Sequence, residues 1–283
     1  MGRSHIKGNS GFLGLDKRGQ YSGDTVGSVS VQKHYLERRL GHFEPIIPPT
    51  PPAGNILFED DFSTGDLSKW NVVNGSEASA WIVGTDVRDS NGGTGNEGGS
   101  AVTIPSGQTY AAFVSNNGTN NYYDPSSDVH MYFDVTIPLG ATALTLTFDW
   151  MCFGERSTST TAYLNYDLGY IMMSPTTFTP VAGTKYDDEG TGNPRNWARL
   201  IGGTTAPNDD GGRFTSDGAG SRDSGAQDVF VQETITITST NPGTTGTWCT
   251  NCDRRFSFSW MCDGSIQDNP SFTVANVVLK YED

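Results

Sequence analysis

The sequence predicts an all-β protein, a two-sheet jelly-roll sandwich preceded by an extended N-terminal arm with one short helix. Residues 144–155, LTLTFDWMCFGE, alternate between apolar and polar side chains, which indicates a strand with one buried face. Roughly ten short segments of this kind follow one another, separated by turn residues about every 8–12 positions, a spacing typical of β-sandwiches. Gly, Ser, Thr, Asn and Asp are abundant, which favours turns over helices.

Two of the alternating segments carry the same residues at matching places. Residues 148–155 read FDWMCFGE and residues 258–265 read FSWMCDGS, so Phe, Trp, Met, Cys and Gly coincide. We interpret them as two core strands of similar shape. A sharper hypothesis makes them neighbours in one sheet, which would put Trp150 and Trp260 into one core.

The chain divides into an arm, a linker and a body. Residues 1–44 form the arm, whose Gly-rich, aperiodic start cannot offset its ordering entropy alone. Residues 45–54, PIIPPTPPAG, predict a semi-rigid polyproline spacer of about 3 Å per residue; an incidental linker between packed parts is the alternative. Residues 55–283 hold all the strand patterns and form the jelly-roll body.

A short helix is expected in the arm over residues 30–40, SVQKHYLERRL. Ser30 can cap its start, and Gly41 stands where a helix C-cap glycine belongs. A helix of this length is marginal in isolation, so it must dock on the body or on another chain. The expected docking residues of the arm are Phe12, Leu15, Tyr35, Arg38, Arg39 and Phe43.

Charge separates the arm from the rest of the chain. Up to Glu44 there are seven Lys and Arg against four Asp and Glu, whereas the remainder has eleven against twenty-eight. A phosphate backbone would be repelled by so acidic a body, so we expect no nucleic-acid partner. The basic arm could touch an acidic partner surface, or it could be a solvated arm.

No apolar run is long enough to span a bilayer, so we expect no membrane insertion. The N-terminus MGRSHIKGNSGF lacks the apolar core of a signal peptide. We therefore expect synthesis and assembly in a cytoplasm, where the four cysteines would be reduced.

Catalytic groups are scarce in the body. Three of the four histidines lie in the arm, and His130 stands in an alternating strand with no nucleophile or acid partner that the sequence can name. The Glu-x-Asp-x-x-Glu strand of laminarinase-type jelly rolls is missing, and paired carboxylates are always findable in an acidic chain. We expect a protein that is not an enzyme.

The cysteines raise a zinc alternative. Cys249 and Cys252 have CxxC spacing, but a zinc site needs four ligands, so Cys152 and Cys262 would have to converge on the same turn. Free buried thiols on the two echoing strands, together with a reduced CxxC turn, are the simpler interpretation. A Cys152–Cys262 disulfide would require neighbouring strands and release from the cell.

Acidic clusters raise a calcium alternative, although we expect no cofactor. Oxygen ligands for Ca²⁺ could come from Asp60, Asp61 and Asp66, or from Asp187, Asp188 and Glu189. More often such clusters are solvated loops.

Aromatic residues in the loops could read a glycan. An exposed ring on a sandwich can stack on a sugar, and the candidates are Tyr122, Tyr123 and Trp248. Packing is the commoner fate of such residues.

The body resembles a known group of β domains. FEDDFSTGDLSKW, AAFVSNNGTNNY, VTIPLGATALTLTFDWMCFGE and FSWMCDGSIQDNPSFTVANVVL are similar to segments of MAM-like, galactose-binding-like jelly-roll domains. This resemblance implies a sandwich without catalytic activity that serves in adhesion or carbohydrate binding. Many relatives carry an Asp that helps to bind structural calcium where this chain has Ala275, before Asn276 and Val277, so the resemblance does not extend to that calcium site.

The arm resembles a different group. Its order of Gly, Ser30, a small helix, Arg38-Arg39, Gly41, an aromatic residue and a Pro-rich linker is similar to the leader of virion structural proteins of marine tailed phages. This resemblance implies a docking peptide that carries interchangeable heads.

Together these observations predict a non-enzymatic structural protein of a tailed-phage virion, assembled in the host cytoplasm. Its arm would dock on other virion proteins of the capsid, neck or tail, in a homo-oligomer or a symmetric multicopy array. The body would be displayed, with attachment to a host-surface glycan as its task. The alternative is a carbohydrate-binding adhesin of a bacterial surface or secreted protein, and a hydrolase ranks third.

Overall fold

The computed structural model describes most of the body. The described residues are 55–90, 99–124, 126–154, 167–186, 199–200, 213–214, 228–238, 249–264 and 270–283, and they belong to one compact unit, Gly54–Asp283. The arm with its expected helix and docking residues, the proline spacer, Trp248 and the acidic residues 187–189 all lie outside the described residues.

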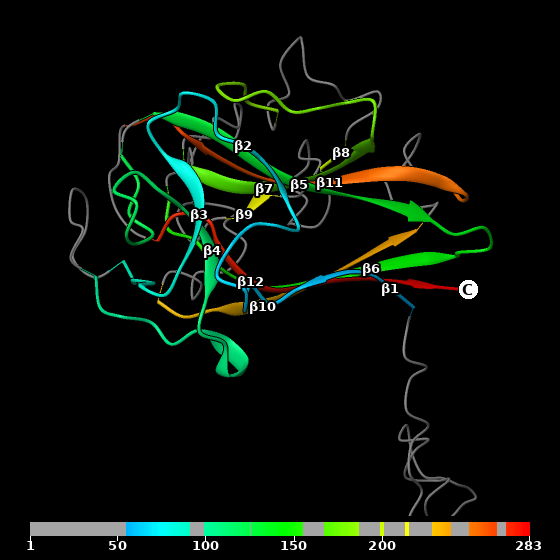
Figure 1. Ribbon diagram of the computed structural model, residues 1–283, viewed down its shortest axis with the longest axis horizontal. Helices are drawn as coiled ribbons and strands as arrows, with labels where there is room; N and C mark the ends of the chain where they lie inside the picture. The colour runs from blue at the N-terminus through cyan, green and yellow to red at the C-terminus, as the bar shows by residue number, and fades with distance from the viewer. Residues whose placement is uncertain are drawn as a thin grey trace, which may run out of the picture. The chain divides into compact units, whose positions relative to one another are not determined.

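Two antiparallel sheets form the body (Figure 1), which confirms the predicted all-β sandwich. The first sheet has the order β10-β6-β12-β4-β3, with β1 also pairing with β12. Its strands are β1 (Asn55–Asp60), β3 (Ala80–Gly84), β4 (Ala111–Ser115), β6 (Ala143–Met151), β10 (Val231–Thr238) and β12 (Thr273–Glu282).

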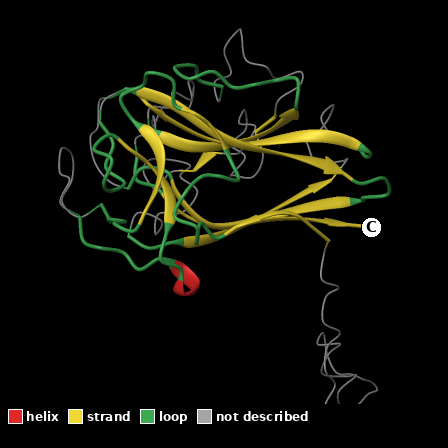
Figure 2. Ribbon diagram, viewed as in Figure 1, coloured by secondary structure: helices red, strands yellow, loops and turns green. Residues whose placement is uncertain are grey.

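The second sheet has the order β2-β5-β11-β7-β8, with β9 also pairing with β7. Its strands are β2 (Asn71–Val73), β5 (Ser127–Ile137), β7 (Leu168–Pro175), β8 (Arg199–Leu200), β9 (Arg213–Phe214) and β11 (Cys252–Cys262). Figure 2 shows a single turn of helix among the described residues, the 3-10 segment Pro105–Gly107. No helix in the described part of the chain is long and apolar enough to cross a membrane.

The two echoing segments are β6 and β11, and they are not neighbours. Strand β6 lies between β10 and β12, whereas β11 lies between β5 and β7 in the other sheet. The hypothesis of adjacent strands is therefore wrong, and the interpretation as two similar core strands is confirmed. Trp150 and Trp260 still enter one core, because the two strands face each other across the sandwich.

Aromatic side chains from both sheets fill the space between them. Phe258 of β11 lies at the centre, with its ring 5.4 Å from Trp70 and 5.4 Å from Phe148 of the opposite sheet. Phe133 stacks on Phe58 at 3.7 Å between ring centroids. Edge-to-face and offset pairs of this kind add to the energy of burying the rings.

Both outer faces of the sandwich are partly covered by long connections. Val87 and Ile104 belong to the segment between β3 and β4 and pack on Phe113, Met151 and Ala275 of the first sheet. Phe178 and Tyr186 belong to the segment after β7 and pack on the second sheet. We call this second segment, residues 176–186, the strap; Figure 1 shows it in yellow-green on the outer side of its sheet.

Gly169 lies in close contact with Phe272 in the core and yields a stability prediction. A Cβ atom there would lie 2.2 Å from the ring of Phe272, so we expect Gly169→Ala to lower the free energy of unfolding by roughly 1–3 kcal/mol through overpacking. Urea unfolding of the full chain measures it, with the exposed Gln232→Ala as control. Equal stability of the two variants would contradict this packing.

Candidate functional site

The outer face of the second sheet carries an unusual share of polar and charged side chains. Strand register places Asp128, His130, Tyr132, Asp134 and Thr136 of β5 on this face, because Val129, Met131, Phe133 and Val135 enter the core. Across from them, β11 presents Met261, Ser259, Ser257, Arg255 and Asp253 in the same order. One face therefore gathers hydroxyl, carboxyl, imidazole and guanidinium groups.

The strap covers one half of this face. The Gly183 amide donates to the Asp128 carbonyl at 2.8 Å, and the Tyr170 hydroxyl accepts a bond from the Tyr186 amide at 3.2 Å. Phe178 and Tyr186 bury their rings against β7 and Met261. This half of the face is closed and serves to hold the strap.

His130 lies under the strap with both ring nitrogens engaged. Its Nε2 lies 3.1 Å from the Val181 carbonyl, which can only accept, so Nε2 carries the proton. Nδ1 then accepts from the Ser259 hydroxyl at 2.9 Å. Burial lowers the pKa of His130 to about 4, and the neutral ring is built into the strap rather than available as a catalytic base.

Asp128, two residues before His130 on the same face of β5, has a raised pKa where that of His130 is lowered. Burial raises the pKa of its carboxyl to about 6, opposed by the charge of Lys185 and assisted by that of Glu77. Its Oδ1 has no hydrogen-bond partner among the described residues. The carboxylate is therefore costly to ionise where it stands.

The other half of the face is open. The strap leaves the side chains on the strand ends of this half uncovered, and we call this set of side chains the outer strip. Register aligns Asn71 of β2 with Tyr132 of β5, and Thr136 of β5 with Asp253 of β11. The outer strip consists of Asn71, Tyr132, Asp134, Thr136 and Asp253, all exposed except the half-buried Tyr132.

Arg255 fixes the geometry of the outer strip from within. Its Nε and Nη2 donate to the two oxygens of Asp134 at 2.8 and 2.7 Å, a bidentate pair. Its Nη1 donates to the Phe178 carbonyl and to the Thr179 hydroxyl, both at 2.7 Å. Its guanidinium also lies 3.8 Å from the ring centroid of Tyr132. Strap, carboxylate and aromatic ring are thereby held by one side chain.

This arrangement suits recognition rather than chemistry. The Tyr132 ring is held by the Arg255 guanidinium stacked on it, and its neighbours offer hydroxyl, amide and carboxylate groups. Asp134 is paired with the same guanidinium, which does not deprotonate. A rigid aromatic surface with polar groups around it can contact a ligand that has both an apolar face and hydroxyl groups.

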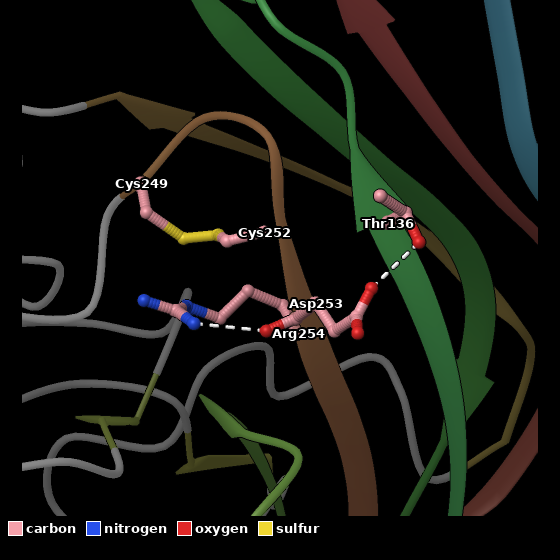
Figure 3. The surroundings of a disulfide bond; sticks show 5 residues. All are labelled: Thr136, Cys249, Cys252, Asp253 and Arg254. Atoms are coloured by element: carbon pink, nitrogen blue, oxygen red, sulfur yellow. Dashed lines mark hydrogen bonds between the residues drawn. A yellow bond between two sulfur atoms is a disulfide. The ribbon is translucent and has the colours of Figure 1, made fainter.

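The CxxC turn differs from the expectation. Cys249 and Cys252 form a disulfide at the start of β11 (Figure 3), so the interpretation of a reduced turn is wrong. Two sulfurs bonded to each other are not thiolate ligands for zinc, and no group of three or more His, Cys, Asp or Glu in the described ranges could hold a metal ion. The short separation of the two cysteines lets a tight turn close the bridge.

The other two cysteines are free and buried, as the simpler interpretation states. Cys152 follows β6 and Cys262 ends β11, strands that lie in different sheets. Burial raises the pKa of both thiols far above the usual range. A disulfide between them is not formed.

Tyr122 and Tyr123 are packing residues, not a glycan platform. Their exposed fractions are 6% and 0%, and the Tyr123 ring lies 4.7 Å from that of Trp260. Both residues follow a polar turn, and the structure gives them the commoner fate of such residues, which is packing. The third candidate, Trp248, lies outside the described residues.

The three aspartates proposed for calcium serve local structure. Asp60 accepts bonds from the Phe62 amide and the Trp70 indole, and the Lys69 ammonium lies 3.7 Å from its Oδ1. Asp61 and Asp66 each accept an amide two residues ahead. Hydrogen bonds from the side chains of Ser63 and Ser68, and then from their backbone amides, lower the pKa of the two carboxyls. Their oxygens close turns, and a lysine supplies the cation beside Asp60.

Sequence reasoning missed the outer strip. Tyr132, Asp134 and Thr136 lie on the polar side of an alternating strand, which indicates solvent exposure but no function. Only the register that sets Arg255 opposite Asp134 brings them together. An arginine inside the alternating β11 was the available signal.

Comparison with known proteins gives fold likeness only. No protein-family model and no curated sequence matches the chain. The chain is similar to the enzymatically active domain of bacteriophage CBA120 tailspike protein 4, at 8% identity and a TM-score of 0.42, with 82% of this chain and 22% of that chain covered.

The chain is also similar to two carbohydrate-binding modules over nearly the full length of each module. TmCBM61, solved with β-1,4-galactotriose, gives 13% identity and a TM-score of 0.35, covering 81% of this chain and 99% of that one. A family 11 module from Clostridium thermocellum, solved with a mixed-linked tetrasaccharide, gives 12% identity and a TM-score of 0.37, covering 81% and 97%. Identities and TM-scores this low transfer neither a ligand nor an activity, so the function must be argued from the chain's own residues.

Two groups under the strap predict opposing effects of acid on stability. His130, with a pKa of about 4 in the folded protein and about 6.5 when unfolded, costs stability as the pH falls from 6.5 to 4. Asp128, with a folded pKa of about 6, adds stability as the pH falls from 6 toward its ordinary value.

Substitutions separate the two effects in urea unfolding between pH 7 and pH 4. Asp128→Asn removes the stability that protonation of Asp128 adds in acid. The free energy of unfolding of this variant should therefore fall more steeply with decreasing pH than that of the wild type. His130→Asn should fall less steeply. Parallel curves for all three proteins would contradict the assignment.

Proposed function

We propose that this chain is a non-enzymatic attachment protein whose body binds glycans through the outer strip. The observation that carries the proposal is the Tyr132 ring held by Arg255, which is itself bonded to Asp134 at 2.7 and 2.8 Å. An aromatic ring that is fixed before binding loses little conformational entropy when a ligand stacks on it.

The ligand class follows from the polar groups around the ring. Asp134 and Asp253 carry carboxylates, and the chain has a net charge of −14, so an anionic sugar would be repelled. Neutral sugars offer hydroxyl donors to carboxylate, amide and hydroxyl acceptors, and their C–H faces suit an aromatic ring. We therefore infer neutral, hydroxyl-rich oligosaccharides.

Binding without catalysis fits the residues of the body. His130 uses both ring nitrogens to hold the strap and Ser259. The pKa of its ring is lowered to about 4 by burial, so it is neutral near pH 7 but has no free lone pair with which to accept a proton. The proposal accordingly assigns no reaction.

For the whole chain, we propose display on a tailed-phage virion. Support comes from the sequence of the arm, in which Gly, an expected helix and Arg38-Arg39 follow one another, and from the proline-rich segment after it. The arm would dock on other virion proteins in a multicopy array, and the spacer would hold the body away from them. A bacterial surface adhesin with the same glycan-binding body is the alternative, and the arm decides between them.

The glycan proposal is tested with the full chain on an array of neutral and sialylated galacto-, gluco- and xylo-oligosaccharides. We expect binding to neutral members only. Tyr132→Ala should weaken binding about tenfold, whereas Tyr132→Phe keeps the ring and should stay within about threefold.

Gln232→Ala, on the outer face of the first sheet, is the matched control and should bind as the wild type does. No hit on the array would refute glycan binding. If Tyr132→Ala binds the same glycans with unchanged affinity, the glycan site lies outside the outer strip.

The display proposal is tested by deleting residues 2–44. We expect the shortened protein to be absent from purified particles, because the docking segment is gone, while circular dichroism shows an intact β body. Mass spectrometry of the particles gives the answer. Particles that still contain the shortened protein would refute docking by the arm, and a full chain found only in cell fractions would favour the adhesin.

A further inference from the structure

The disulfide turn adjoins the outer strip. Asp253 of the strip directly follows Cys252, and its Oδ1 accepts a bond from the Thr136 hydroxyl at 2.6 Å. Figure 3 shows Asp253 pointing to Thr136 on one side of β11, while the disulfide and Arg254 lie on the other side. The disulfide therefore lies beside the end of β11 that carries Asp253, on the side of the strand away from Thr136.

Backbone contacts with β5 also hold the turn, which runs directly into the paired start of β11. The Asn251 amide donates to the Ile137 carbonyl at 2.7 Å, and Asn251 has a left-handed backbone with φ of 57°. That conformation is unfavourable for a residue with a side chain, although Asn tolerates it better than most. The bridge between Cys249 and Cys252 closes the turn in which Asn251 lies.

We propose that the Cys249–Cys252 disulfide is a redox clasp for the outer strip, so that the oxidised protein binds its glycan tightly and the reduced protein binds it weakly. The inference rests on the proposed glycan function of the same face. Opening the bridge frees the turn, and the first residues of β11 can then separate from the end of β5. The Thr136–Asp253 hydrogen bond and its contribution to the site are lost.

The chemistry is a thiol–disulfide exchange. One thiolate of a dithiol reductant attacks a sulfur of the bridge and expels the other as a thiolate; its second thiolate then attacks the mixed disulfide and releases the protein. Two electrons and two protons pass to the protein, which gains two thiols, and the reductant becomes a cyclic disulfide. A small-molecule disulfide reverses the step.

Accessibility makes the clasp selective. Cys249 and Cys252 are half-buried, whereas Cys152 and Cys262 have an exposed fraction of 0%. Burial also raises the pKa of these two thiols, so few of them are ionised and reactive. A reductant or an alkylating reagent should therefore act on the turn alone in the folded protein.

This selectivity fits a change of compartment. A chain made in a reducing cytoplasm would have an open turn, and release into an oxidising medium would close it. The outer strip would then become complete outside the cell in which the protein is made. Binding to glycans inside the producing cell would be weak.

The test uses the full chain, before and after treatment with dithiothreitol and removal of the reagent under nitrogen. Iodoacetamide and mass spectrometry count thiols: we expect no label on the folded oxidised protein and two labels, at Cys249 and Cys252, on the folded reduced protein. Hydrogen exchange should become faster at the start of β11 and the end of β5 on reduction, with the centre of β6 as the unchanged reference.

Binding is measured on the array of neutral and sialylated oligosaccharides. We expect binding to the neutral members to weaken about tenfold on reduction, the scale of one or two lost polar contacts. The double variant Cys249→Ser with Cys252→Ser should match the reduced protein and no longer respond to dithiothreitol. Gln232→Ala, which keeps the bridge, should respond as the wild type does.

The outcomes separate the two proposals. Equal binding in both redox states, or unchanged hydrogen exchange at the strand ends, overturns the clasp and leaves glycan binding standing. No binding in either state overturns the proposed function. Two labels on the folded protein before reduction would show that the bridge is absent and would overturn the clasp directly.

Discussion

The body depends on aromatic packing between two sheets that share no strand. Phe258 lies between Trp70, Phe148 and Phe272, so residues from both sheets and from the first and last parts of the body meet around one ring. Phe148 and Phe258 point inward because the alternation of their strands is unbroken, whereas Trp70 and Phe272 lie directly before β2 and β12. Since register decides which side of a strand is buried, the core also decides which residues remain on the outer faces, and the candidate site is a consequence of that choice.

The outer faces of the two sheets are covered in different ways. On the first sheet, the segment between β3 and β4 supplies apolar cover, and the remaining face of β10 presents Gln232 and threonines to solvent. On the second sheet the strap covers one half, and Arg255 ties the strap to the open half by four hydrogen bonds shared among Asp134, Phe178 and Thr179. A buried arginine would be costly without such partners, so the outer strip and the strap are stabilised together.

Periodicity predicted the fold well because each strand carries its own signal. The segments around Phe148 and Phe258 alternate over their full length, and both are core strands. Pairing is not encoded in a single strand, which is why the similarity of β6 and β11 suggested a neighbourhood that does not exist. The sequence left open whether Tyr122 and Tyr123 are exposed or packed, because a polar loop before them does not show how the chain folds back, and the structure packs both rings. The disulfide was missed because a reducing compartment was inferred from the N-terminus, and because the sequence alone does not give the geometry that brings the sulfurs of Cys249 and Cys252 together.

We propose that the outer strip, and no other face of the body, receives a neutral glycan. NMR spectra of the full chain, recorded during titration with the neutral oligosaccharides, test this most directly because they locate contact without any substitution. We expect shifts of the Asn71 and Tyr132 signals and of the Thr136 methyl group, while the signals of Gln232 and Thr236 of the first sheet stay unmoved. Shifts centred on the first sheet, or no shifts at all, would contradict it.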